Sequence, residues 1–248
     1  MTRPRMIIGC LAVLVLVGGF AWGATGLHPF GTGHSRYGNH LAHSTVPQRA
    51  ATNSVVVTAF DYRAFDTVGE EFILFISVVG VVVLLRAIRG DADDRPEDEL
   101  VPEQRRISEA SRWLGAALVG PLTVLAAYVV VHGQLTPGGG FQGGVILMAG
   151  LAAIFLGGEY LLLLRLRRSA TVPQLADAGG AAGFVMIGFG GLIGTGVFLQ
   201  NFLPNGSQGS LLSGGMIPLA NISVGIEVAG ALLMVLSELL DQRLLGSQ

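Results

Sequence analysis

The sequence predicts an all-α integral membrane protein with about six transmembrane helices and with both termini in the cytoplasm. Of its 248 residues, 51% are hydrophobic and only 13% are charged, whereas a soluble domain usually carries about 25% charged residues. The hydrophobic residues form long uninterrupted blocks instead of the short periodic faces of a soluble core. The basic residues between these blocks are unevenly distributed, which predicts the orientation of the chain.

Six hydrophobic blocks are long enough for a span, which needs about 20 mostly apolar residues. Their approximate ranges are 6–25, 71–88, 113–131, 145–164, 178–199 and 217–240. The first block follows Arg3 and Arg5, so a cleaved signal peptide is the alternative to a retained helix. Its length, which exceeds that of a typical signal-peptide core, favours the retained helix.

The arginines predict which side of the membrane each segment faces. If the N-terminus is cytoplasmic, only Arg36, Arg49 and Arg63 lie outside, all in one long loop, and the other twelve of the fifteen basic residues lie inside. This positive-inside bias places both termini in the cytoplasm and supports an even number of spans. The sequence contains no lysine, and its net charge of -2 gives no indication of nucleic-acid binding.

An acidic segment divides the chain into two parts. Residues 91–103, DADDRPEDELVPE, contain seven acids, one arginine and two prolines, which is typical of a solvated cytoplasmic linker. We therefore predict a two-span unit over residues 1–90, a linker over 91–106 and a four-span domain over 107–248.

The most distinctive motif is HGQLTPGGGFQGG, residues 132–144. Its glycines and proline cannot continue the third helix, so the chain should turn here at the outer surface. The exposed N–H groups of such a turn could bind an anion or dock against a partner, but composition favours a compact turn between helices. The residues assigned to this interface or loop motif are Pro137, Gly138, Gly139, Gly140, Phe141, Gln142, Gly143 and Gly144.

Glu227 lies near the centre of the sixth block. An ionisable group at this depth costs about 2.5–3.5 kcal/mol on insertion scales, so it should face protein, water or a partner subunit. Ser223, four residues earlier, could hydrogen-bond it on the same helix face. A role in a proton relay and a simple polar contact between helices both remain open.

Asp66, Glu70 and Glu71 lie at the predicted outer start of the second span. Carboxylates there oppose the positive end of the helix dipole, and Asp66 or Thr67 could act as the N-cap. An acid at the outer surface could also collect protons or sodium ions, and Glu70 is the strongest candidate of the three.

Two further residues are candidates for the ion path. Glu159 lies about 9 Å of helix rise before Arg165, so a snorkelling contact with that arginine is the favoured interpretation. His132 ends the third span and could either shuttle protons or simply hydrogen-bond at the helix end.

No metal or cofactor site is predicted. His28, His34, His40 and His43 share the outer loop, but their spacing fits no established ligand pattern, and the single cysteine, Cys10, excludes an intrachain disulfide and a CxxC motif. The pairs Gly179/Gly183 and Gly190/Gly194 in the fifth span have the small-xxx-small spacing that lets helices approach closely.

Several of these segments resemble a known family. Residues 132–150, HGQLTPGGGFQGGVILMAG, and residues 218–233, PLANISVGIEVAGALL, closely resemble the B subunit (MrpB or MnhB) of multi-subunit Mrp-type Na+/H+ antiporters. That likeness covers roughly residues 107–240. Residues 53–71, NSVVVTAFDYRAFDTVGEE, resemble the segment before the last helix of the large A subunit, and equally the small two-span subunit of membrane-bound hydrogenases.

The resemblance implies a subunit of a cation/proton antiporter complex in the plasma membrane of a prokaryote. Its implied partners are the other membrane subunits, lipid, Na+ and H+, with no nucleic acid and no cofactor. The family's transporting subunits use a buried lysine and glutamate, so this lysine-free chain should not transport alone. The resemblance also implies a transporter subunit and not an enzyme. The residues assigned to the ion or proton path are Glu227, Glu70, which matches the glutamate of the family's FDTxGE segment, Asp66, His132 and Glu159.

Two alternatives remain. The chain could be a membrane module of an energy-converting, hydrogenase-like oxidoreductase, in which related subunits occur. It could instead be a purely structural assembly subunit, which would tolerate substitution of every buried acid.

Overall fold

The computed structural model describes residues 3–27, 35–89, 108–156 and 171–246, and every regular element within these ranges is helical. The chain divides into two compact units, Met1–His40 and Leu41–Gln248. Each unit is described by itself.

The first unit contains helix α1, Arg3–Thr25. Its residues 7–25 are apolar enough to cross a membrane, and none of them is buried within the protein. A helix that is hydrophobic around its whole circumference requires an apolar environment on every side. Lipid or other membrane helices must therefore surround α1.

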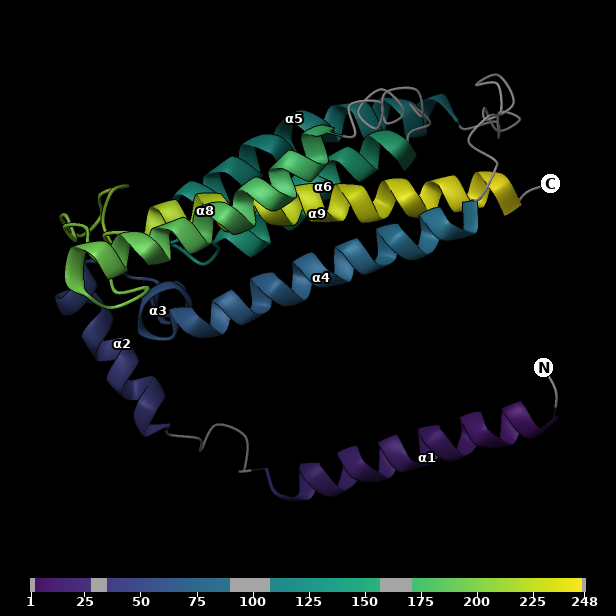
Figure 1. Ribbon diagram of the computed structural model, residues 1–248, viewed down its shortest axis with the longest axis horizontal. Helices are drawn as coiled ribbons and strands as arrows, with labels where there is room; N and C mark the ends of the chain where they lie inside the picture. Colours follow the sequence, from purple (N-terminus) through teal and green to yellow (C-terminus); the bar gives the residue numbers. More distant parts are fainter. Residues whose placement is uncertain (1–2, 28–34, 90–107, 157–170, 247–248) are drawn as a thin grey trace. The chain divides into compact units, whose positions relative to one another are not determined.

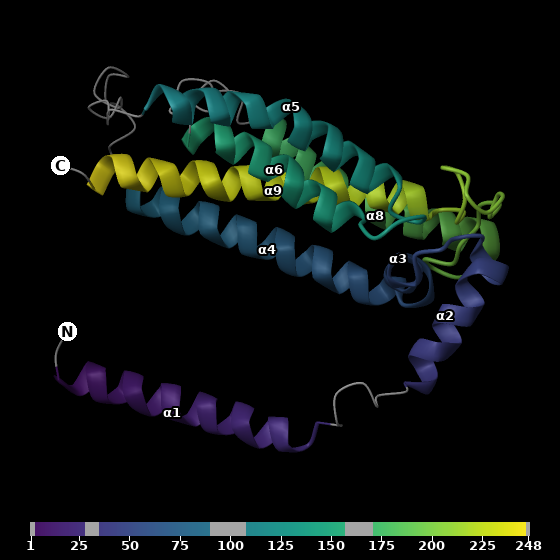
Figure 2. The ribbon, with the colours of Figure 1, turned by 180° about the vertical axis from the view of Figure 1, so that it is seen from behind.

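In the described part of the second unit, five long helices form a bundle. They are α4 (Ala64–Arg89), α5 (Glu109–Val131), α6 (Gly140–Leu156), α8 (Thr171–Thr195) and α9 (Ile217–Gly246). The helices run side by side in Figures 1 and 2, and α9 packs against all four others. α4, α6 and α9 begin at the same end of the bundle, where α5 and α8 finish.

That shared end carries most of the irregular structure, and we call it the cap. The cap consists of residues 41–63, 132–139 and 196–216. It includes the second half of α2 (Arg36–Arg49), the short helix α3 (Ser54–Val57) and a π-helical turn, η1 (Thr58–Tyr62).

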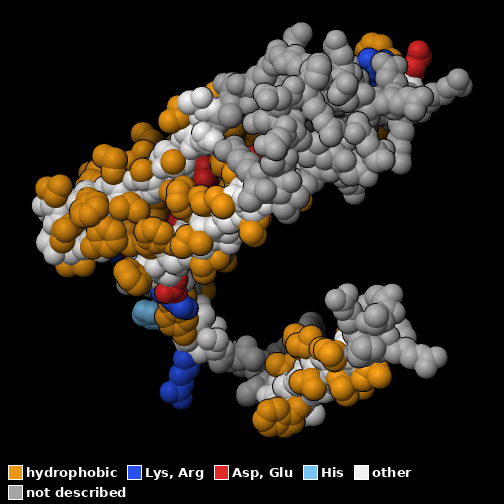
Figure 3. All heavy atoms as spheres, turned by 45° about the vertical axis from the view of Figure 1, so that its right-hand side comes forward, with side chains coloured by type: hydrophobic (Ala, Val, Ile, Leu, Met, Phe, Trp, Pro, Cys, Tyr) orange, Lys and Arg blue, Asp and Glu red, His pale blue; other side chains and the backbone are white. Residues whose placement is uncertain are grey.

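The helices confirm the predicted class of all-α membrane protein. Five of the described helices are long and apolar enough to cross a membrane, and α6 adds a shorter apolar helix over Gly140–Ile154. On the described part of the second unit, hydrophobic side chains cover much of the face that is visible in Figure 3, with a few acidic side chains among them. Other hydrophobic side chains are buried between the helices. Val78 and Val82 of α4 pack against Ala231 and Met234 of α9.

Most helices begin earlier than the approximate hydrophobic blocks that the sequence predicted. The difference is largest for α4, α6 and α8, which begin at Ala64, Gly140 and Thr171, whereas the blocks began near residues 71, 145 and 178. The first turns of these helices contain polar or glycine residues, so they lay outside the predicted hydrophobic blocks. Within the folded bundle these residues are helical. As a consequence, Asp177 lies inside a membrane-crossing helix, and Glu71 lies two turns into one instead of at its first residue.

The predicted N-cap of the second span was also wrong. Because α4 starts at Ala64, both Asp66 and Thr67 lie within its first turn. Thr67 donates its hydroxyl hydrogen bond to the carbonyl of Ala59 at 2.6 Å, and so ties α4 to η1. Asp66 forms an ion pair with Arg63.

Candidate functional site

Helices α8 and α9 cross so closely that two glycines are required at the crossing. A Cβ atom placed on Gly180 would lie 2.6 Å from both the Cβ and the backbone nitrogen of Glu227. A Cβ atom placed on Gly230 would lie 2.6 Å from the backbone nitrogen of Asp177. The antiparallel crossing therefore brings Asp177 against Gly230 and Glu227 against Gly180, one helical turn apart.

Three acidic side chains are buried in this part of the bundle. Glu71 of α4, Asp177 of α8 and Glu227 of α9 are only 3%, 2% and 0% exposed, and all three lie within membrane-crossing segments. Glu71 precedes Leu74 and Val78 on the stripe of α4 that packs against α9. Asp177 lies on α8, which contacts both α4 and α9.

Most carboxyl oxygens of these three residues have no hydrogen-bond partner in the part of the chain that the structure describes. Both oxygens of Glu71, both oxygens of Glu227 and Oδ1 of Asp177 are buried and unpaired within the described part of the chain. An ionised carboxylate buried without a partner is costly, so each group requires a proton, a cation, water or a partner side chain. Within the described ranges, no three His, Cys, Asp or Glu side chains are close enough together to hold a metal ion.

The glycine motif forms a packed joint between α5 and α6. α5 ends at Val131, and Gly138 and Gly139 adopt positive φ angles of 153° and 137°, in the region that favours glycine. The N–H of Gly140 then donates to Oδ1 of Asn221 on α9 at 2.9 Å and starts α6.

The segment at residues 52–53 is attached to this joint. Nδ2 of Asn53 donates to the carbonyls of Gly133 and Thr136 at 2.8 and 2.9 Å. The backbone N–H groups of Thr52 and Asn53 both donate to the carbonyl of Gln134 at 3.1 Å. These bonds connect segments that the sequence assigned to different modules.

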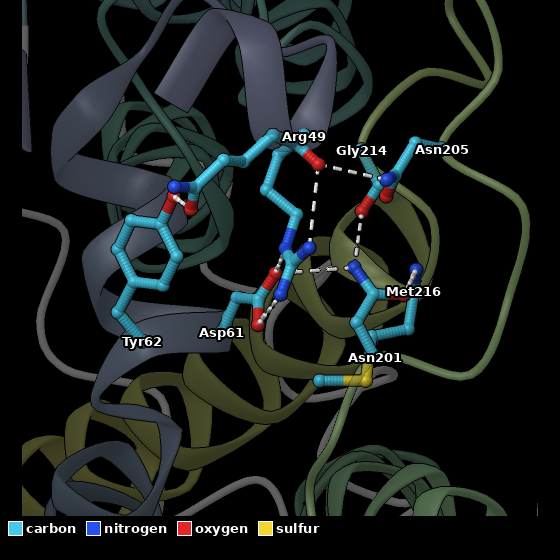
Figure 4. A network of polar contacts seen from close by, with 8 residues as sticks. Arg49, Asp61, Tyr62, Asn201, Asn205, Gly214 and Met216 are labelled. Atoms are coloured by element: carbon cyan, nitrogen blue, oxygen red, sulfur yellow. Dashed lines mark hydrogen bonds and ion pairs between the residues drawn. The ribbon is translucent and has the colours of Figure 1, made fainter. Parts of the chain in front are cut away.

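A second polar network holds the cap together (Figure 4). Arg49 forms an ion pair with Asp61, whose side chain is 5% exposed. Asn201 donates from Nδ2 to Asp61 at 3.2 Å and to the carbonyl of Gly214 at 2.9 Å, and its Oδ1 accepts from the N–H of Met216 at 3.0 Å. Residues 49–61 are therefore fastened to the loop that precedes α9.

Comparison with protein families identifies the chain. The family described as "Domain related to MnhB subunit of Na+/H+ antiporter" matches residues 110–234, and the family of the MBH E subunit matches residues 11–105. The chain belongs to the MnhB-related family. The predicted resemblance is thereby confirmed for both parts of the sequence.

Two curated relatives of this MnhB-related protein cover different shares of it. Uncharacterized protein MJ1307 of Methanocaldococcus jannaschii is 29% identical over 210 residues, which are 78% of this chain and 77% of that protein. The A/B subunit of a probable K(+)/H(+) antiporter of Rhizobium meliloti is 31% identical over 123 residues, which are 43% of this chain but only 12% of that protein.

Two solved structures share the fold. Each has a TM-score of 0.69 and 23% identity, and covers 96% of the MnhB-related chain. One is the membrane-bound sulfane sulfur reductase (MBS), an archaeal respiratory membrane complex, in which 99% of the matched chain is covered. The other is the Mrp complex from Dietzia sp. DQ12-45-1b, in which 26% of the matched chain is covered.

The predicted path residues of the MnhB-related protein do not all lie together. Glu227 is fully buried at the α8–α9 crossing, whereas Glu70 and Asp66 are on the exposed side of α4. His132 ends α5 in the cap, where its ring stacks on Tyr128 with 4.1 Å between centroids. Glu159 lies outside the described residues.

The predicted hydrogen bond between Ser223 and Glu227 was wrong. Both Glu227 oxygens lack a partner among the described residues. The hydroxyl oxygen of Ser223 lies 2.8 Å from a Cβ atom placed on Gly183. Ser223 therefore packs against Gly183 and Glu227 against Gly180, and the two side chains do not hydrogen-bond each other along α9.

The predicted glycine pairs of the fifth span were partly wrong. A Cβ atom on Gly179 would meet no atom within 4 Å, and Gly190 and Gly194 face Phe202 of the cap instead of another helix. Gly180, which the pairing rule did not select, makes the closest approach to α9. Glycine spacing indicated close packing but not which face of the helix provides it.

For the glycine motif, the structure confirms the compact turn. A Cβ atom on Gly144 would lie 2.7 Å from Cβ of Val228, so this part of the motif is packed against α9. The N–H of Gly140 is occupied by Asn221, and that of Gly143 donates to the carbonyl of Gly139 at 3.0 Å. These two donors are therefore not free to bind an anion. Pro137 and Gln142 remain exposed.

Sequence reasoning missed one buried acid and did not predict the burial of another. Asp177 was placed just before the fifth span, although the alanines and glycines that flank it favour a continuing, closely packed helix. Glu71 was ranked below Glu70. No sequence pattern indicated a further group of buried atoms that lack partners among the described residues, namely Oε1 of Gln134, Oγ of Ser213 and Nδ2 of Asn221.

Proposed function

We propose that this chain is a non-enzymatic subunit of a multi-subunit Na+/H+ antiporter complex and that it supplies an acid-lined part of the ion or proton path. Membership of the MnhB-related family supports the assignment to an antiporter complex. The observation that carries the path is the burial of Glu227 at the centre of a membrane-crossing helix, where its two oxygens have no partner among the described residues. A bundle that needed only packing there would gain stability from an apolar side chain.

The proposed partners follow from the same features. The chain carries no lysine, so it cannot supply the buried lysine that the resemblance implies for transporting subunits. It therefore acts with other membrane subunits, within lipid, on Na+ and H+, in the plasma membrane of a prokaryote. We also propose the organisation into residues 1–90, a linker over 91–106 and a domain over 107–248, which the two matched families support.

Glu70, Asp66, His132 and Glu159 are proposed to serve the path at its ends. Glu70 and Asp66 are exposed where α4 begins, and His132 lies in the cap. Solvent-facing acids at a path entrance raise the local concentration of cations. Glu227, by contrast, would carry a proton or ion through the interior.

The test uses membrane vesicles that contain the whole complex. Glu227→Gln and Glu70→Gln should each slow cation-driven proton movement, with Glu227→Gln slowing it by about tenfold, a barrier increase of about 1.4 kcal/mol. Both changes preserve side-chain size, so assembly should persist on a native gel. Glu109→Gln, at an exposed acid that begins α5, is the matched control. Normal antiport in Glu227→Gln would reject the path and leave a scaffolding role.

A hydrogenase-like or respiratory context is the second candidate. The match of residues 11–105 to the family of the MBH E subunit and the shared fold with a chain of the MBS complex favour it. Purification of the complex from native membranes distinguishes the two. Partners with Fe–S cysteine motifs would support the second candidate, and partners limited to apolar antiporter subunits would support the first.

A further inference from the structure

The turn between α5 and α6 presents a row of backbone carbonyls to a segment far away in the sequence. All four carbonyls of residues 133–136 accept hydrogen bonds from Thr52 or Asn53. Both backbone N–H groups, the Nδ2 group of Asn53 and the hydroxyl of Thr52 are the donors. Because each buried backbone carbonyl needs a donor, two adjacent residues satisfy this whole stretch of the turn.

Asn53 has two separate roles in this contact. Its Oδ1 accepts from the N–H groups of Val55 and Val56 at 3.1 and 3.4 Å and so caps α3, while its Nδ2 donates to the turn. An aspartate could take over only the first role, because a carboxylate accepts hydrogen bonds and does not donate them. The contact with residues 133–136, and not the start of α3, therefore requires an asparagine.

Apolar side chains extend the same contact toward α4. Phe60 of η1 is 2% exposed, and its ring centroid lies 5.8 Å from that of Phe184 on α8. One buried cluster combines Ala51, Val56, Val57, Phe60 and Ala64 with Phe184, Leu199, Ile217, Ala220, Val224 and Val228. Residues 51–60 precede the membrane-crossing segment that begins at Ala64, so exposing their apolar side chains to water would be unfavourable.

These contacts divide the chain differently from the two family matches. Residues 41–89 lie within the match to the MBH E subunit, but they belong to the same compact unit as the MnhB-related helices. The covalent connection between α4 and α5, residues 90–107, lies outside the described residues. None of the contacts named above involves it.

We propose that residues 133–136 are a docking site for the Thr52–Asn53 segment and that this contact, with the apolar cluster around Phe60, holds residues 41–89 on the MnhB-related part without the covalent connection. The MnhB-related part is then an incomplete body, whose missing element is a segment with an asparagine followed by the apolar turn of η1. The proposal concerns assembly and goes beyond the role in an ion path.

The test breaks the chain between Asp98 and Glu99. Cells that make the whole complex express residues 1–98 and 99–248 as two pieces, with an affinity tag at the end of the second. We expect the two pieces to copurify in equal amounts. Loss of the first piece from an assembled second piece would overturn the proposal.

Substitutions in the broken chain show which contact retains the first piece. Asn53→Asp keeps the cap of α3 but places a carboxylate against two carbonyls, so it should lower retention severalfold. Gln48→Glu is the matched control, since it makes the same amide-to-acid change where the side chain only accepts a hydrogen bond, from Tyr62. Unchanged retention in Asn53→Asp would show that other subunits hold the piece, and would also overturn the proposal.

A milder variant guards against a general failure to fold. Thr52→Val removes only the hydroxyl donor to Leu135, and it should lower retention less than Asn53→Asp does. If Asn53→Asp prevents assembly of the unbroken chain on a native gel, Thr52→Val decides, and retention equal to that of Gln48→Glu would reject the docking site. The readout is retention and not transport, so the result is independent of the outcome for Glu227→Gln.

Discussion

At the residue scale, the packing of Glu227 against Gly180 is the feature that defines the surroundings of this buried acid. The α8–α9 crossing places the backbone and Cβ of Glu227 against Gly180, and both oxygens of its carboxyl group are buried without a hydrogen-bond partner among the described residues. In water such a group would be solvated, but in a membrane interior the alternatives are a proton, a cation or a partner subunit. The absence of a methyl group on Gly180 therefore permits the close approach of α8 to α9 at Glu227.

Gly180→Ala should destabilise the bundle. The new methyl group would lie 2.6 Å from backbone atoms of both Ser223 and Glu227, which cannot move aside without shifting α9. Overpacking of this kind costs about 1–3 kcal/mol, and the apparent melting temperature of the detergent-solubilised complex should fall. The neighbouring Gly179→Ala is the matched control, because its methyl group would meet no atom within 4 Å. Equal melting temperatures for the two variants would contradict the crossing.

Short elements of the cap fasten the helices at one end. α3 and η1 are each a single turn and could not be stable alone, yet they are fixed by side-chain bonds to segments far away in the sequence. Asp61 and Asn201 are 140 residues apart, and Asn53 and Gly133 are 80 residues apart. The cap thus joins the segment before α4 to the loop before α9, and it positions the first turns of both helices.

Arg49→Gln should destabilise the cap. It leaves Asp61, with a side chain that is 5% exposed, without its cation, and a hydrogen bond to a charged group contributes about 1.5–3 kcal/mol. Limited proteolysis should then cut residues 41–63 or 196–216 faster than in the wild type.

The matched control for Arg49→Gln is Arg63→Gln. It breaks the ion pair with Asp66, in which both side chains are more than half exposed, at 58% and 51%. A pair this exposed contributes no more than about 1 kcal/mol. Equal protection of the cap in the two variants would show that the Arg49–Asp61 pair does not hold it.

At the scale of the whole molecule, the bundle has two ends that must face opposite sides of the membrane. α5 contains 23 residues, so it spans about 34 Å, enough to cross the hydrocarbon core. Its two ends therefore lie on different sides. The arginine distribution predicts that the end with the glycine turn, and hence the cap, faces outward.

Cysteine labelling tests this orientation. In a Cys10→Ser background, a cysteine at the exposed position Pro137 should react with a membrane-impermeant maleimide applied to intact cells. A cysteine at Glu109, at the other end of α5, should react only after the membrane is permeabilised. The reverse pattern would invert the bundle and exchange the inner and outer roles of every residue in the path.

The sequence by itself determined the membrane class, the order of the spans, the turn at residues 132–139 and the family. These features depend on composition and on motifs of adjacent residues, which need no knowledge of neighbouring helices. Asparagine side chains at positions 53, 201 and 221 gave no comparable signal, because their partners are distant in the sequence and are chosen by the fold.

Only the tertiary structure decided which acids are enclosed. Glu70 and Glu71 are adjacent and chemically identical, yet one residue of an α-helix turns the side chain by about 100°. That rotation leaves Glu70 exposed and places Glu71 on the stripe that α9 covers. The packing of α4 and α8 against α9, and not the local sequence, selects Glu71, Asp177 and Glu227 as the acids that must find a proton, a cation or a partner.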